Sequence, residues 1–405
     1  MQKTITKQVT MRVPASWNKE AQYYWLESQP QQAIQTVISQ LNEYVNTKRP
    51  ADLMMQLSYY LYLNGDRLAA AKFLEVAYEQ HPDHPEIIKN LAVTLSSTAQ
   101  DERALSYWDK YLTLFPNDYV AYDAMCMSYF RSKRIDEAKA AGAKALWLKD
   151  QAYGQIQQPL IFPADCPQNY LTTDLKNVIS FSLWGNKPRY LRGAIDNALA
   201  RFYIYPDWVM RFYVDESVPK EVCDTIEKLG GEVVYEALGQ TTKQKLAWRF
   251  KVANDPTVGR FLVRDIDSVV NSREKNAVEQ WIKSDKWFHI MRDWWSHTDL
   301  ILAGMWGGIA NILPQLDEML ANYTPQAMET PNIDQWFLRD KVWSYVKQSC
   351  LIHDRFFKGN GHQEWQSDRW QENSAWHVGQ DIHAVEPHLQ AQRLYFWMNT
   401  LNSLR

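Results

Sequence analysis

The chain has 405 residues, which is enough for two or three domains that each bury a core of their own. Its formal net charge of −3 argues against a nucleic-acid-binding protein, because the phosphate backbone requires a basic surface. The four cysteines are scattered, and no run of 18 apolar residues is present to span a membrane. We therefore expect a cytoplasmic protein, with peripheral contact at the inner face of the membrane as the alternative.

A 34-residue period runs through the N-terminal third of the chain. Pro82 and Pro116 are one period apart, and further columns share this spacing: Ala70, Ala104 and Ala138; Leu57, Leu91 and Met125; Leu61, Leu95 and Tyr129; Ala77, Tyr111 and Ala145. This period is typical of tetratricopeptide repeats, in which each unit is a helix hairpin. We expect an all-α repeat domain over residues 1–165, with repeats near 51–84, 85–118 and 119–152 and a degenerate hairpin at 17–50.

Repeat arrays of this kind bury the apolar face of each hairpin against its neighbours and leave a concave surface. That surface commonly binds a peptide or a protein, so we expect the array to engage a partner protein or a second copy of the chain. A purely structural brace is the alternative.

Beyond residue 170 short β-rich runs alternate with helical segments. The runs cover residues 177–183, 209–214, 232–236 and 259–263, with amphipathic segments at 189–203 and 219–229 between them. This alternation predicts a second, α/β domain with a Rossmann-like, mostly parallel sheet, which we place at residues 170–358. Ligands of such sheets bind beyond the carboxyl ends of the strands. Residues 359–405 form a tail whose apolar pattern predicts a terminal helix near 388–404.

The fourth β-rich run ends in Arg264-Asp265-Ile266-Asp267-Ser268. Two carboxylates separated by one residue lie on the same side of an extended chain. There they can hold a divalent cation whose other ligands are phosphate oxygens. An Asp-x-Asp pair also occurs by chance in surface loops, but its position after an apolar strand favours a site.

Six segments together resemble a known family: Ser180-Phe-Ser-Leu-Trp-Gly185, 264–268, Phe288-His-Ile-Met-Arg-Asp293, Gly304-Met-Trp-Gly-Gly308, Asp334-Gln-Trp-Phe337 and Leu351-Ile-His-Asp354. Residues 177–357 resemble a GT-A-type glycosyltransferase domain, and the chain is similar to bacterial polysaccharide-type transferases that couple such a domain to helical repeats. The resemblance implies transfer of a sugar, with Mn²⁺ or Mg²⁺, from a nucleotide-sugar donor to a glycan, lipid-linked glycan or protein acceptor. A UDP-sugar is the first candidate donor, and the repeats would recruit the acceptor or a partner.

The resemblance also implies roles for single residues. Asp265, Asp267 and His353 would be the metal ligands, with Asp265 also near the ribose, although a lone histidine is commonly structural. Asp334 and Gln335 would lie beside the anomeric carbon, and a carboxylate at that position is also a plausible helix N-cap.

The remaining candidates would contact the donor or the acceptor. Those for the nucleotide sugar are Ser180, Leu183, Trp184, Arg249, Arg264, Gly304 and Trp306. The two arginines match a diphosphate but could instead pair with the aspartates. Residues 304–308 could equally form a buried turn, and Asp293 and His297 are candidates for activating the acceptor as general bases.

Two other functions remain open. A haloacid-dehalogenase-type phosphatase also carries Asp-x-Asp after an apolar strand, but on the first strand of its domain, whereas three strands precede this one. A non-enzymatic adaptor with a degenerate catalytic domain is the other alternative.

Overall fold

The computed structural model describes residues 14, 16–44, 47–171, 174–325, 332–359, 362–363, 365 and 377–381. The chain divides into two compact units, and the main division falls between Leu148 and Lys149. The predicted terminal helix near 388–404 lies outside the described residues. Within the described ranges, no helix combines the length and the apolar character needed to cross a bilayer.

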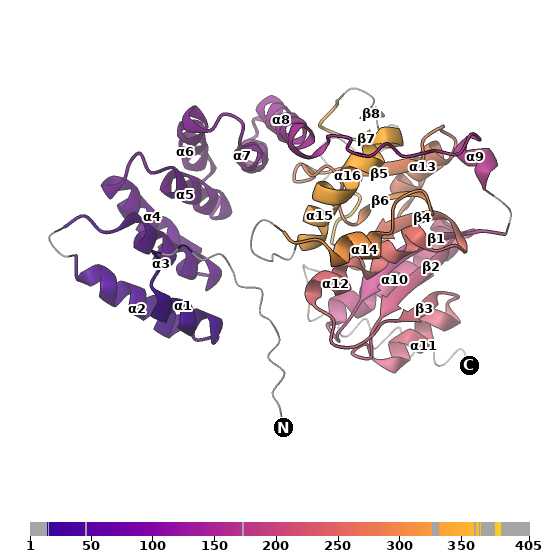
Figure 1. The fold of residues 1–405 in the computed structure, drawn as a ribbon, viewed down its shortest axis with the longest axis horizontal. Coiled ribbons are helices and arrows are strands. Elements are labelled where there is room, and N and C mark those ends of the chain that lie inside the picture. Colours follow the sequence, from indigo (N-terminus) through magenta and orange to yellow (C-terminus); the bar gives the residue numbers. More distant parts are fainter. Residues whose placement is uncertain are drawn as a thin grey trace. The chain divides into compact units, whose positions relative to one another are not determined.

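The first unit is a tetratricopeptide-type helical array (Figure 1). Its helices are α1 (Lys19–Leu26), α2 (Pro30–Asn42), α3 (Ala51–Leu63), α4 (Arg67–Gln80), α5 (Pro85–Ser97), α6 (Asp101–Leu114), α7 (Tyr119–Arg131) and α8 (Ile135–Tyr153). Helices α1 to α6 pack as consecutive hairpins, and α5 also contacts α3 and α7, the first helices of the neighbouring hairpins. The 34-residue period therefore predicted the architecture correctly, because Ala70, Ala104 and Ala138 are all fully buried.

The turns between paired helices follow the same period. Gly65, Ala99 and Lys133 have φ angles of 92°, 57° and 64°. In each turn the following backbone N–H donates to a carbonyl five residues back: Asp66 to Leu61 at 3.0 Å, Gln100 to Leu95 at 3.0 Å and Arg134 to Tyr129 at 2.9 Å. This is the Schellman ending of a helix, in which glycine fits best because it lacks a Cβ.

The second unit contains an eight-stranded sheet (Figure 1). Its strands are β1 (Lys176–Leu183), β2 (Val209–Val214), β3 (Glu232–Tyr235), β4 (Val258–Arg264), β5 (Phe288–Arg292), β6 (Met305–Ile309), β7 (Cys350–Asp354) and β8 (His362–Gln363). They are ordered β3-β2-β1-β4-β6-β5-β7-β8, and only β6 runs antiparallel to its neighbours. The mostly parallel sheet that the alternating pattern predicted is confirmed.

Helices precede and connect the strands. They are α9 (Pro167–Tyr170), α10 (Pro188–Ile204), α11 (Lys220–Lys228), α12 (Thr242–Ala247), the 3-10 helix η1 (Trp248–Asn254), α13 (Ser272–Ile282), α14 (Leu316–Ala321), α15 (Ile333–Phe337), the π-helical turn η2 (Leu338–Val342), α16 (Trp343–Val346) and η3 (Lys347–Ser349). Helix α10 contacts β1 and β2, and η1 contacts β1, β2 and β4.

Residues 304–308 do not form the turn considered from the sequence. Met305 to Ile309 are the buried strand β6, which lies between β4 and β5. A Cβ at Gly307 would meet the carbonyl oxygen of Phe261 at 2.4 Å, and one at Gly308 would meet the Phe288 ring at 2.5 Å. The glycines therefore let the antiparallel strand fit closely between its neighbours.

The segment after residue 148 belongs to the α/β unit, although the sequence placed the boundary at 165–170. Asp150 accepts a hydrogen bond from Trp343 Nε1 at 2.7 Å, and Leu160 N donates to Gln348 Oε1 at 2.8 Å. The Phe162 ring stacks on Trp287 with 5.6 Å between ring centroids. These contacts fix residues 149–171 along the α/β unit.

Candidate functional site

The Asp265–Asp267 pair directly follows β4, which lies between β1 and β6 in the sheet. β4 runs parallel to β1, so the pair emerges at the carboxyl end of the parallel strands. That is the edge at which open α/β sheets bind ligands. The structure therefore places the pair where the sequence predicted it, directly after a strand of the mostly parallel sheet.

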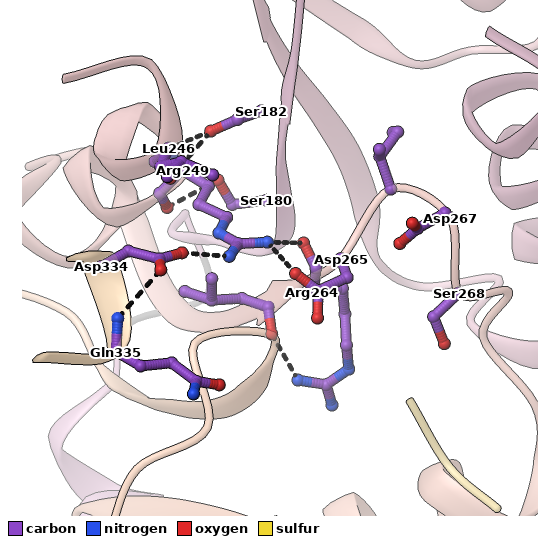
Figure 2. Close-up of polar contacts among 12 residues, drawn as sticks. Ser180, Ser182, Leu246, Arg249, Arg264, Asp265, Asp267, Ser268, Asp334 and Gln335 are labelled. Carbon is purple, nitrogen blue, oxygen red and sulfur yellow. Dashed lines mark hydrogen bonds and ion pairs between the residues drawn. The ribbon is translucent and has the colours of Figure 1, made fainter. Parts of the chain in front are cut away.

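A buried arginine joins the pair to a second carboxylate (Figure 2). Arg249 Nη1 donates to Asp265 Oδ1 at 2.5 Å and to the carbonyl oxygen of Arg264 at 3.0 Å, and Nη2 donates to Asp334 Oδ2 at 2.9 Å. Both Arg249 and Asp334 are almost fully buried, whereas the Asp265 side chain is 42% exposed. Asp265 is thus the member of this triad that a ligand can reach.

Two serines on one face of β1 hold the backbone of Arg249. Ser180 Oγ donates to the carbonyl oxygen of Arg249 at 2.8 Å, and the Arg249 N–H donates to Ser182 Oγ at 3.0 Å. Residues 180 and 182 share a face because side chains alternate along a strand. Ser180, which was predicted to contact the nucleotide sugar, therefore positions η1 in this structure.

Two glycines allow other segments to approach the Asp265–Asp267 turn. A Cβ at Gly304 would meet Asp265 Oδ2 at 2.1 Å. A Cβ at Gly193, on α10, would meet the carbonyl oxygen of Ile266 at 2.0 Å. Gly304 was predicted to contact the sugar or the acceptor, and the structure shows that its small size makes room for the Asp265 carboxylate.

Asp267 contacts a different arginine from Asp265. Arg189 Nη2 donates to Asp267 Oδ2 and, at 2.5 Å, to Asp381 Oδ2. Burial and the neighbouring charge of Asp265 raise the pKa of Asp267, and the hydrogen bond from Arg189 opposes this shift. The two aspartates of the motif therefore repel each other electrostatically, and each is already paired with a guanidinium group.

Asp334 and Gln335 lie in α15 and connect to the same network. Asp334 is the second residue of α15 rather than its N-cap, which is Asn332. Burial raises the pKa of Asp334, while Arg249 opposes the rise and Asp265 adds to it. Gln335 Nε2 donates to Asp299 Oδ2 at 2.8 Å, so the side-chain amide is held in one orientation.

Two residues predicted to touch the nucleotide sugar point into the core instead. Arg264 Nε donates to Glu274 Oε1 at 3.0 Å, and Nη1 donates to the carbonyl oxygen of Trp306 at 3.2 Å. Figure 2 shows its guanidinium directed away from Asp265. Trp306 is fully buried on β6 and packs edge-on against Phe261 at 5.2 Å. Both residues serve the packing of the sheet, because both faces of β6 and of the end of β4 are buried.

His353 is not brought to the aspartates as a third ligand. It lies on β7, shares a hydrogen bond of 2.9 Å with His289, and is 3.0 Å from Gln280 Oε1 through its other ring nitrogen. Over the described ranges, no three His, Cys, Asp or Glu side chains gather as a metal-binding group. The predicted trio of Asp265, Asp267 and His353 is therefore not assembled, because β6 and β5 separate β7 from β4.

Asp293 and His297 also have structural partners. Arg273 binds both Asp293 oxygens, at 3.0 and 2.9 Å, and Asp293 Oδ2 accepts from the Val378 N–H at 2.9 Å. His297 Nδ1 accepts from the backbone N–H groups of Asp293 and Trp294. A base needs a nitrogen or oxygen that can take a proton from the acceptor, and these contacts occupy the atoms that would do so.

The end of β1 remains the most open part of the predicted base-binding region. Leu183 is buried, whereas Trp184 is partly exposed and lies edge-on to Trp248 with 6.2 Å between ring centroids. Lys245 Nζ donates to Asp215 Oδ2 at 2.7 Å at the neighbouring end of β2. Trp184 is therefore the member of its predicted group that is placed to contact a ligand.

Four residues of the network were missed from the sequence: Lys149, Arg189, Asp299 and Asp381. Arg189 could have been identified from the sequence, because it lies in the first turn of the helix that follows the first strand, and anions commonly bind at such helix N-termini. Asp381 and Lys149 lie more than a hundred residues from their partners, and no local pattern marks such a pair.

No protein-family model matches the chain, and no curated protein matches it. Among solved structures, MamA residues 41–end from Desulfovibrio magneticus RS-1 is 18% identical, covers 32% of this chain and 72% of its own, and has a TM-score of 0.30. Another crystal structure of MamA is 20% identical, with 35% and 76% covered and a TM-score of 0.30. A Thermobaculum terrenum O-GlcNAc transferase mutant is 13% identical, covers 61% of this chain and 44% of its own, and has a TM-score of 0.36. Likenesses this low carry no argument about function.

Proposed function

We propose that the α/β unit is a GT-A-type glycosyltransferase that moves a sugar from a nucleotide-sugar donor, a UDP-sugar first, to a glycan, lipid-linked glycan or protein acceptor. The observation that carries the proposal is the exposed Asp265 carboxylate at the carboxyl edge of the sheet, linked through buried Arg249 to Asp334. This arrangement joins the Asp-x-Asp motif to the Asp334–Gln335 pair, which the sequence resemblance relates to the sugar end of the donor.

We propose that Asp265 and Asp267 hold a divalent cation. The charge of Asp265 raises the pKa of Asp267, so two carboxylates repel each other at this turn, and a cation between them would relieve that repulsion. Mn²⁺ or Mg²⁺ bound there would neutralise the departing nucleotide diphosphate. The remaining ligands would come from phosphate oxygens and water, since no third protein carboxylate or imidazole joins the pair within the described residues.

The protein's own residues would then orient the reaction. Arg249 holds Asp265 and Asp334 at opposite ends of one guanidinium group, which fixes the distance between the two carboxylates. Gln335 is held through its amide nitrogen by Asp299. Trp184, partly exposed at the end of β1, offers a ring on which a nucleotide base could stack.

For the repeat unit, we propose that it recruits the acceptor or a partner protein, or pairs with a second copy of the chain. Support comes from its tetratricopeptide-type helix packing, since repeat arrays of this kind commonly bind partners on a concave surface.

The test is a panel of nucleotide sugars, assayed for calorimetric binding and for transfer or hydrolysis with and without Mn²⁺ or Mg²⁺. We expect one donor class to bind with metal present, and Asp267→Ala to abolish that binding. Asp255→Asn is the matched control, because Asp255 pairs with Arg211 before β4 begins and so lies at the other end of that strand.

Three results would count against the proposal. If no nucleotide sugar binds in the presence of metal, or if Asp267→Ala behaves like Asp255→Asn, the site is not a metal-dependent donor site. Hydrolysis of simple phosphomonoesters would favour the phosphatase alternative instead.

A further inference from the structure

A buried lysine lies at the far end of the hydrogen-bond network that reaches Asp265. The Lys149 side chain is only 3% exposed, and its Nζ donates to the carbonyl oxygen of Thr298 at 2.9 Å and to Asp299 Oδ1 at 2.8 Å. Removing an ammonium group from water is costly unless it is paired and hydrogen-bonded. Both conditions hold here, and both partners lie in the segment between β5 and β6.

The second oxygen of Asp299 is directed at the candidate site. Asp299 Oδ2 accepts from Gln335 Nε2 at 2.8 Å. An ionised carboxylate can only accept hydrogen bonds, so the Gln335 amide must turn its NH₂ group toward Asp299 and its carbonyl oxygen away. Because Lys149 holds Oδ1 of a partly exposed carboxylate, it fixes the rotamer that places Oδ2 against Gln335.

Gln335 is adjacent to the residues that reach Asp265. Its backbone N–H donates to Asp334 Oδ1 at 2.9 Å, and Asp334 Oδ2 is bound by Arg249, which also binds Asp265. Side chains from five segments of the chain therefore form one continuous series of contacts, beginning at Lys149 and ending at Asp265.

We propose that Lys149 is a positioning residue for the candidate site: through Asp299 it sets the orientation of the Gln335 side-chain amide. Its effect on turnover rests on the proposed function, whereas its effect on the orientation of Gln335 does not. In this series of contacts Lys149 acts on the site through Asp299 and Gln335.

The test compares four variants of the full chain. Lys149→Met removes the charge and keeps the length of the side chain, and Lys149→Arg restores a cation. Asp299→Asn keeps an oxygen for Lys149 but presents N–H groups to Gln335, which should reverse the amide. Asp150→Asn is the matched control, because Asp150 anchors the same helix end to Trp343 and Lys347 without touching Asp299.

Hydrogen exchange measured by mass spectrometry gives a readout that does not depend on activity. We expect Lys149→Met and Asp299→Asn to speed exchange in peptides covering residues 333–337 and in the segment 293–304. Lys149→Arg should retain most of the protection, and Asp150→Asn should leave 333–337 unchanged. If Lys149→Met and Asp150→Asn give the same exchange at 333–337, the positioning role is overturned.

Kinetics separate this inference from the proposed function. With a donor identified, we expect Lys149→Met to lower kcat by about ten- to a hundred-fold, the cost of a small misplacement, with the donor Kd changed less than twofold. An equal loss of donor affinity would overturn the role. If the wild-type chain transfers no sugar, the proposed function fails, and the exchange experiment still decides the role of Lys149.

Discussion

Among single residues, Arg249 is the buried cation that joins two carboxylates of the candidate site. Its guanidinium is buried with Asp334, and it lies between two carboxylates that raise its pKa above the ordinary value despite the opposing effect of burial. Arg249→Met would leave the buried Asp334 carboxylate without a counter-charge. We expect a loss of about 3–5 kcal/mol in the free energy of unfolding, measured with denaturant, because one partner of a buried pair is removed.

The control for Arg249 is the exposed pair of Lys220 and Asp224. Lys220→Met should leave the free energy of unfolding almost unchanged, because exposed ion pairs contribute little. Equal losses in the two variants would show that Arg249 does not stabilise the buried carboxylates.

The buried histidines predict how stability depends on pH. Burial lowers the pKa of His353 to about 4, and burial together with the charge of neighbouring groups holds the pKa of His289 well below its usual value. Both rings are therefore neutral in the folded chain, while an unfolded histidine takes up a proton below about pH 6.5. Above about pH 6.5 the two histidines do not reduce the free energy of unfolding. As the pH drops toward 4, this free energy falls by up to about 1.4 kcal/mol per pH unit for each histidine.

This pH dependence can be measured as the denaturant midpoint between pH 7 and 4.5. His353→Gln keeps a polar side chain but cannot titrate, so its midpoint should fall less steeply with pH than that of the wild type. Parallel pH profiles for the two proteins would contradict the role of His353.

At the scale of secondary-structure elements, the three repeat turns have different residue types at equivalent positions. The first turn has Gly65 in the left-handed region, whereas the next two have Ala99 and Lys133 there. A residue with a Cβ is strained in that conformation by about 1 kcal/mol or more. Ala99→Gly should therefore raise the free energy of unfolding by about 0.5–1 kcal/mol, read as a higher denaturant midpoint of the helical signal.

The matched control is Ala104→Gly, inside helix α6, where glycine lowers helix stability by about 1 kcal/mol. The two glycine substitutions should therefore shift the midpoint in opposite directions. A decrease in both would show that the turn is not strained by its alanine.

Elements with a local signal could be predicted from the sequence, and those held by distant partners could not. The 34-residue columns predicted the hairpins because three of them, which contain Ala70, Leu57 and Ala77, are buried throughout, and the apolar runs predicted β1 to β4. Strand β6 was missed because glycines at 307 and 308 are unusual inside a strand, where close packing against Phe261 and Phe288 requires them.

The residues of the candidate site follow the same rule: those with a local sequence signal could be predicted, and those with distant partners could not. Asp265 and Asp267 were singled out because they follow an apolar strand directly, and Arg249 because a guanidinium group matches a diphosphate. His353 was assigned as a ligand through the family resemblance, and the strand order does not bring it to the pair, because two strands separate β7 from β4. The Lys149–Asp299 pair spans 150 residues, so only the folded chain reveals it.

At the scale of the whole molecule, the division between residues 148 and 149 predicts that the α/β unit begins at residue 149. A fragment of residues 149–405 keeps the contacts of Lys149, Asp150 and Phe162, while a fragment of 174–405 loses all three. Burial of a phenylalanine side chain alone contributes about 1.5–3 kcal/mol. We expect the shorter fragment to unfold at a temperature lower by about 5 °C or more.

Thermal unfolding of both fragments, followed by circular dichroism, checks this boundary. If the two fragments unfold within about one degree of each other, a difference of well under 1 kcal/mol for this size, residues 149–171 do not belong to the α/β unit.

The close approach of Gly304 to Asp265 limits how the sequence can change during evolution. While Asp265 is kept, any mutation that adds a Cβ at position 304 places it 2.1 Å from the carboxylate, so the two positions cannot change independently. A lineage that replaced Asp265 with a smaller residue would lose the contact with the carboxylate, but the backbone nitrogen of residue 265 would still lie 2.9 Å from the added Cβ. A side chain at 304 would thus mark, in the gene alone, a descendant in which both the carboxylate and the backbone at 265 have moved or changed.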